Sequence, residues 1–326
     1  MTGRRFGLYF AWSRPREIGA PLGALDNRFP TLAEFRRALW PFLDRAIETA
    51  QYDKQDIAGF LDHVILFDFE HFENVIKEVT GQAVSRIQRE DDQPPVKELD
   101  DTFLSHIDTL IVVSLDHYKT EQRASAAEID AVAHFLQRDN ATLVVCPHHD
   151  IGAAASQTAG GTSALKDRRE EFFHHLDGLV PSQQRIGGFA RSLLQGLGFP
   201  IENRWGLNPA ADTDRTPAPL RLYPDLDTLQ VLRGVKTFNL HPHLPHLHVP
   251  ASMSGSVRVL ARQQINPAAK PHPFVRAGSQ YFNAFLWIPP EGSRAGNIFV
   301  CDATLWSAAF EGVSSLQSLW ENLARL

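Results

Sequence analysis

The chain has 326 residues, of which 43% are hydrophobic, and a formal net charge of −6 at pH 7. This length and apolar content are ample for one large α/β domain or two smaller ones, and the acidic balance leaves no basic stripe for nucleic acid. No segment approaches the roughly 20 consecutive apolar residues that cross a bilayer, so we expect no membrane partner.

The two cysteines and the first residues bear on the compartment. Two cysteines, Cys146 and Cys301, cannot form a disulfide framework or a thiolate zinc site. The first ten residues hold two arginines but no apolar signal region and no cleavage site of small residues. Both observations favour a cytoplasmic protein.

The first half of the chain alternates short apolar runs with amphipathic patterns. In chain order, these predict a strand at 6–12, a helix of about 20 residues from 31, a strand at 63–67, a helix at 69–80, a polar loop at 86–102, a strand at 109–113, a helix at 125–138 and a strand at 142–146. Ser125 and Glu128 form a capping box for the third helix. A strand, a helix of this length and a second strand imply a parallel, right-handed crossover.

The second half of the chain is less regular. Its patterns predict a loop of small residues at 152–165, a helix at 182–197, an irregular excursion at 203–228, strands at 235–240, 257–262, 282–288 and 297–301, and a closing helix at 313–326. Asp302 is expected to cap the turn after the last strand.

The predicted fold class is α/β, with a mostly parallel sheet in a three-layer, flavodoxin-like α/β/α sandwich. The sequence shows no internal repeat and no clear linker. We therefore expect one elaborated domain, residues 1–326, with a long insertion around 150–230.

Histidines are concentrated in two short segments. In sequence order they are His148 and His149, and then His241, His243, His246 and His248. The first pair, with Asp150 next to it, follows the predicted strand at 142–146, and the second group follows the predicted strand at 235–240. Because open parallel sheets bind ligands beyond the carboxyl ends of their strands, both segments are expected at one crevice.

Neutral imidazole is the commonest metal ligand and a usual proton carrier near neutral pH. Alternate residues on an extended chain point to one face, so His241 and His243 are expected to act together. The predicted ligands of a divalent ion (zinc, iron or manganese) are His148, His241, His243 and His246. His149 and Asp150 are the predicted catalytic residues, with Asp150 orienting an imidazole or acting as the base.

Three further residues are candidates for substrate contacts. Arg14 and Arg16 follow the predicted first strand and suit bidentate bonds to an anionic group. His117 follows the strand at 109–113 and is expected near His148 at the same sheet edge. Each assignment has a structural alternative, in which the arginines form an ordinary charged turn and the histidines bond the backbone at strand ends.

Four segments resemble one known group of domains. They are the strand within 107–113, the Ser-x-x-Glu helix at 125–138, the strand within 140–146 and the segment 296–307 with its closing strand. In this pattern the chain resembles the class I glutamine-amidotransferase-like superfamily. The resemblance implies a flavodoxin-like fold with a functional elbow after residue 146.

Catalytic members of that superfamily carry a Gly-x-Cys-x-Gly elbow and a late His-x-Glu pair. Cys146 lies near the elbow position, but Val144 and His148 replace its glycines, and no His-x-Glu pair is present. Because the strained elbow needs those glycines, glutaminase activity is not expected.

Two functions stand as alternatives. The first is a metal-dependent hydrolase that acts on a small polar substrate at the C-terminal edge of the sheet. The second is a non-catalytic ligand-binding or assembly module on an amidotransferase-like scaffold, in which the histidines are structural. Both take a small molecule as partner and leave a homo-oligomer open, and no nucleotide cofactor is expected because no phosphate-binding glycine motif is present.

Overall fold

The structure is a computed structural model of the chain. It describes residues 3–13, 69–91, 94–116, 122–151, 166–167, 170–171, 174, 184–308 and 311–326. The predicted helix from residue 31, the strand at 63–67 and the loop at 152–165 lie outside these ranges. Within them, no helix is both long and apolar enough to cross a membrane.

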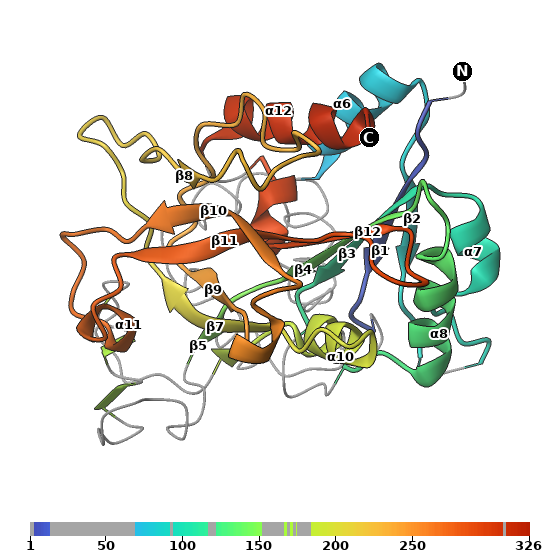
Figure 1. The fold of residues 1–326 in the computed structure, drawn as a ribbon, viewed down its shortest axis with the longest axis horizontal. Helices are drawn as coiled ribbons and strands as arrows, with labels where there is room; N and C mark the ends of the chain where they lie inside the picture. Colours follow the sequence, from blue (N-terminus) through green and yellow to red (C-terminus); the bar gives the residue numbers. More distant parts are fainter. Residues whose placement is uncertain are drawn as a thin grey trace, which may run out of the picture.

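A large mixed sheet runs through the centre of the molecule (Figure 1). In spatial order its strands are β2 (Ser85–Gln88), β1 (Phe6–Phe10), β3 (Thr109–Ser114), β4 (Thr142–Pro147), β12 (Asn297–Cys301), β11 (Tyr281–Ile288), β10 (Arg258–Gln264) and β8 (Arg221–Leu222). Neighbouring strands are parallel from β2 to β12 and antiparallel from β12 to β8. The α/β class and the mostly parallel sheet are confirmed.

The parallel half of the sheet is apolar on both faces. Every residue of β1, β3 and β4 is buried, which is typical of parallel strands covered on two sides. Successive residues alternate between two hydrophobic clusters, so that Val144 belongs to one and Val145 to the other. The strands therefore separate two cores.

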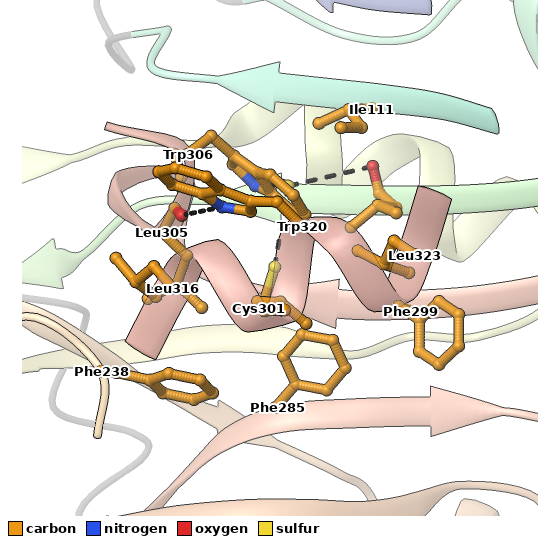
Figure 2. Close-up of a cluster of buried hydrophobic side chains, with 14 of the residues drawn as sticks. Ile111, Phe238, Phe285, Phe299, Cys301, Leu305, Trp306, Leu316, Trp320 and Leu323 are labelled. Atoms are coloured by element: carbon orange, nitrogen blue, oxygen red, sulfur yellow. Dashed lines mark hydrogen bonds between the residues drawn. The ribbon is translucent and has the colours of Figure 1, made fainter. Parts of the chain in front are cut away.

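Helices contribute to each core. Among the described residues the helices are α6 (Glu70–Thr80), α7 (Asp101–Ser105), α8 (Ala126–Phe135), α10 (Gly188–Gly196), α11 (Pro273–Arg276) and α12 (Val313–Ala324), with short 3₁₀ turns η4 (Ala251–Met253) and η5 (Ala303–Trp306). Buried residues of α6 and α12 belong to one core, and those of α8 and α10 to the other. Figure 2 shows the first core, where Trp306 and Trp320 lie beside Cys301.

A second, antiparallel sheet lies next to the first. Its strands, in spatial order, are β6 (Gln184–Arg185), β5 (Asp150–Ile151), β7 (Glu202–Leu207) and β9 (Leu244–His248). The Asn283 side chain of β11 donates to the Leu247 carbonyl of β9 at 3.0 Å, which joins the two sheets. Pro245 is tolerated because β9 is an edge strand.

Four sequence predictions are corrected by the structure. The loop expected at 86–102 contains most of β2 and the start of α7. β2 is an edge strand with exposed and half-buried side chains, so its sequence lacks the apolar pattern of a strand. The helix expected at 182–197 begins only at Gly188, because β6 precedes it and Gly187 has a φ of 82°. The irregular excursion at 203–228 holds β7 and β8.

The fourth correction concerns the segment before the second histidine group. Residues 235–240 are not a strand, and the strand nearest to them in the chain is β9. Val235 and Phe238 are buried in an irregular conformation, which produces a strand-like apolar pattern without backbone pairing. The histidines of 241–243 therefore lie in a turn between this segment and β9.

A buried charge network joins the sheet edge to α8. The predicted capping box is confirmed, since Ser125 accepts from the Glu128 backbone and Glu128 accepts from that of Ser125. The Arg89 side chain is 3% exposed and pairs with Asp91, Glu98 and Glu128. Removing one partner of such a buried network leaves an uncompensated charge, so the network constrains this end of the sheet.

Replacement of Arg89 is expected to destabilise the fold strongly. In Arg89→Met the carboxylates of Glu98 and Glu128 lose their buried counter-charge, and the free energy of unfolding should fall by about 3–5 kcal/mol. The matched control is Arg86→Met, which removes a more exposed pair with Glu73 and should cost less than about 1 kcal/mol. Urea unfolding measures both, and equal losses would contradict the network's role.

Candidate functional site

The carboxyl ends of three parallel strands bring polar residues together. Asp116 follows β3, His148 and His149 follow β4, and Asp302 follows β12. In the register of these strands, Ser114 lies opposite the last residue of β4. The three strand ends thus meet at one edge of the sheet, where parallel sheets bind ligands.

Two histidine segments about ninety residues apart converge at this edge. The His148 ring lies 4.2 Å from that of His149 and 4.8 Å from that of His241, measured between ring centroids. The His243 ring lies 5.1 Å from that of His149 and 5.6 Å from that of His241. We call His148, His149, His241 and His243 the imidazole cluster.

A chain of hydrogen bonds links the two segments of the cluster. His148 Nδ1 lies 3.0 Å from Asp302 Oδ2, and the Thr304 hydroxyl and backbone N–H donate to the other carboxylate oxygen. Asn239 donates to the Thr304 hydroxyl at 2.8 Å and accepts from the His241 backbone at 3.2 Å.

This network fixes the role of one imidazole. Because an ionised carboxylate only accepts hydrogen bonds, Nδ1 of His148 is the donor in this bond, and Nε2 is the ring nitrogen that Asp302 does not engage. Asp302 caps η5 as predicted, but its bond to His148 was not anticipated from the sequence. Asp302 and His148 each follow an apolar strand directly, and this shared position is the sequence signal that could have predicted their contact.

Burial lowers the pKa of two histidines of the cluster, His241 and His243. All four side chains are at most 6% exposed. Burial, assisted by the neighbouring His148 and His174, lowers the pKa of His243 to about 3. Burial likewise lowers the pKa of His241 well below 6.5. The neutral imidazole is the form that accepts protons and binds metals.

Two more histidines lie beside the cluster. His174 has both ring nitrogens bonded, with the Lys270 carbonyl at 2.8 Å and the Asn208 backbone N–H at 3.0 Å. The His272 ring is 5.0 Å from that of His174, and its Nε2 lies 3.6 Å from a Glu171 carboxylate oxygen. His272 was missed in the sequence because it stands alone, without a neighbouring histidine or strand pattern.

Two other predicted site residues, His246 and Asp150, lie on strands of the second sheet. His246 lies on β9, accepts the Asn283 backbone N–H at 3.2 Å and packs its ring 4.7 Å from that of Phe274. Asp150 lies on β5, 3.8 Å from the Arg191 guanidinium, and the carboxylate that faces His148 is that of Asp302. Arg14, Arg16 and His117 are outside the described residues.

The side chains of the cluster are of the types that bind metal ions, but their present positions do not form a metal site. Neutral imidazoles and a carboxylate on the outer nitrogen of one ring are the donor set of many zinc sites. In the described part of the chain, however, no three His, Cys, Asp or Glu side chains are arranged to hold an ion as they stand. His241 Nδ1 accepts the His243 backbone N–H at 3.2 Å, so that nitrogen is already engaged.

Comparisons with known proteins identify no family. No family model matches the chain. No curated protein matches it either. Among the solved structures that match is one titled "mmIFT52 N-terminal domain", 12% identical, covering 75% of this chain and 85% of that one with a TM-score of 0.38. A likeness this distant carries no argument about function.

The bond between Asp302 and His148 can be tested by the tautomer of the ring. In the wild-type protein, ¹⁵N NMR should place the His148 proton on Nδ1, and Asp302→Asn should change the ¹⁵N shifts of that ring because the charge-assisted bond is lost. Thr304→Val is the control, since it keeps the backbone bond to Asp302. Unchanged His148 shifts in Asp302→Asn would show that this pairing does not exist.

The free energy of unfolding should decrease as the pH is lowered from about 6.5 toward 3. Burial lowers the pKa of His246 from 6.5 to about 3. Between these two pH values the His246 imidazole is protonated more readily in the unfolded chain than in the folded protein. The folded state therefore keeps its full stability above pH 6.5 and loses part of it as the pH falls toward 3. His246→Asn keeps an acceptor for the Asn283 N–H and should make that loss shallower, whereas the exposed His134→Asn should not. Urea midpoints between pH 7 and 4 measure the difference.

Proposed function

We propose that this protein is a metal-dependent hydrolase that acts on a small polar substrate at the carboxyl edge of its sheet. The observation that carries the proposal is the convergence of four buried imidazoles from segments 148–149 and 241–243. These rings lie beyond the carboxyl ends of parallel strands, which is where open parallel sheets bind ligands.

The residues that would hold the ion are His148, His149 and His243. His148 presents its Nε2 lone pair because Asp302 engages the other nitrogen. Turning of the His149 and His243 rings about their side-chain bonds is the rearrangement that binding requires, since their present placement does not form a site. A divalent ion at such a position would supply a Lewis acid and activated water at neutral pH.

The protein's own groups supply orientation and exclusion of water. Asp302 holds the His148 ring, Thr304 donates to Asp302, and Asn239 donates to the Thr304 hydroxyl, so the ring cannot turn freely. Burial of the cluster provides a site of low polarity, in which electrostatic interactions are strong. Arg14, Arg16 and His117 are proposed substrate contacts on sequence grounds alone.

The scaffold we propose is the three-layer, flavodoxin-like arrangement of the amidotransferase-like superfamily. Support comes from the parallel strands β1, β3, β4 and β12 and from helices that contribute to cores on both faces. Cys146 does not serve as a nucleophile in this proposal. Its thiol is fully buried, accepts the Trp306 indole N–H at 2.9 Å and lies 3.8 Å from the Cys301 sulfur.

A specific observation favours the second candidate, a non-catalytic ligand-binding or assembly module. The His241 and His148 rings already have partners in the backbone and in Asp302. In a non-catalytic module, the imidazole cluster would fill a polar interior and join the two sheets. The two candidates differ in whether the protein binds an ion.

Metal content separates the two candidates. Protein made without a histidine tag is stripped with chelator, incubated with Zn²⁺, Fe²⁺ or Mn²⁺ and desalted, and elemental analysis should then find about one equivalent of one of these metals. His148→Gln and His243→Gln should each lower this content, whereas His106→Gln, at an exposed position, should not. Less than about 0.1 equivalent with every metal would falsify the metal-dependent proposal.

The hydrolase assignment needs its own readout. Metal-loaded protein should cleave at least one member of a panel of p-nitrophenyl esters, phosphates and amides, and the stripped protein and His148→Gln should not. Stoichiometric metal without hydrolysis of any of these would favour the non-catalytic module. Circular dichroism confirms that each variant is folded.

A further inference from the structure

Two arginines face each other across the antiparallel end of the large sheet. Arg221 of β8 lies directly opposite Arg262 of β10 in the strand register, so both side chains point to the same face. Like charges opposite each other in a strand pair are destabilising. An anion bound between the two arginines would offset this repulsion.

Aromatic rings hold both guanidinium groups. The Arg221 guanidinium carbon lies 3.8 Å from the centre of the Tyr281 ring, and that of Arg262 lies 5.5 Å from the centre of the Tyr223 ring. Stacking on a ring orders the guanidinium while leaving its N–H groups at the edge open for bonds.

No carboxylate neutralises the pair within the described ranges. Arg221 makes no ion pair there, and Arg262 donates only its Nε hydrogen, to the Asn283 side chain at 3.0 Å. A third arginine, Arg204, lies opposite His246 in the strand register of β7 and β9 and is paired with Glu202 at 2.7 Å. Burial, and then the nearby His248, Arg204 and Arg262, lower the pKa of His246 to about 3, so Arg204 and Arg262 both lie near this histidine.

We propose that Arg221 and Arg262 form a binding site for a phosphoryl group. A phosphate dianion matches the two positive charges and offers oxygen atoms to both planar guanidinium groups, whereas a carboxylate satisfies only one of them. The side chains are accessible to a ligand, since Arg221 is exposed and Arg262, Tyr223 and Tyr281 are half-buried. This site is separate from the imidazole cluster and does not depend on the proposed hydrolase activity.

Calorimetric titration with inorganic phosphate, phenyl phosphate and acetate tests the site, with ionic strength held constant by sodium chloride. The wild-type protein should bind both phosphates and should bind acetate at least about tenfold more weakly. Tighter binding of phenyl phosphate than of inorganic phosphate would identify a monoester as the ligand, since its ring can contact Tyr223 or Tyr281. Equal affinity for the two phosphates would identify the free anion.

Variants locate the binding. Arg221→Gln and Arg262→Gln should each weaken phosphate binding by about tenfold, and Arg221→Lys, which keeps the charge but loses the planar group, should weaken it by an intermediate factor. The matched control is Arg258→Gln. Arg258 is on the same strand and stacks on Trp287 at 4.7 Å, but it faces that ring rather than another arginine.

The proposal fails on either of two results. One is a wild-type protein that does not bind phosphate under matched ionic strength, or that binds acetate equally well. The other is a loss of affinity in Arg258→Gln as large as that in Arg221→Gln, which would indicate a general effect of net charge. Arg221→Lys retains the net charge, so it keeps the test valid if a glutamine variant does not fold.

Discussion

The register of the parallel strands β3, β4 and β12 governs the arrangement of the candidate site. Residue 113 pairs with 146, and 145 pairs with 300, so the three strands end at the same level of the sheet. The residue types that follow them change together, from fully buried apolar side chains to Asp116, His148 and Asp302. The contact between His148 and Asp302 follows from this register, because each stands immediately beyond the end of neighbouring strands.

The imidazole cluster also shows how the fold accommodates polar groups at that edge. Four rings at most 6% exposed are placed where water is scarce, and burial keeps His241 and His243 neutral. Asn239 and Thr304 connect the two segments through Asp302, so that moving one segment breaks bonds in the other. The polar network therefore fixes the position of an irregular segment that no strand pairing holds.

The two halves of the sheet present different chemistry. The parallel half ends in buried imidazoles, whereas the antiparallel half carries arginines on a partly exposed face. Strand direction explains the difference: parallel strands gather their carboxyl ends at one edge, while antiparallel strands place side chains opposite each other along their length. A site at a strand end and a site on a strand face follow from these two geometries.

The sequence by itself determined the strands and helices with strong apolar periodicity, including β3, α8 with its Ser125 cap, β4, β11, β12 and α12. It failed where tertiary contacts replace local pattern: the edge strand β2 is polar because one side faces solvent, and residues around Phe238 are apolar because they pack in the core without pairing. The histidines of the cluster were visible in the sequence as two groups. Only the tertiary structure decided that the two groups meet, and that Asp302 rather than Asp150 is the carboxylate bonded to His148. Local periodicity reports which face of an element is buried, whereas strand register and the path of irregular segments depend on contacts between residues far apart in the chain.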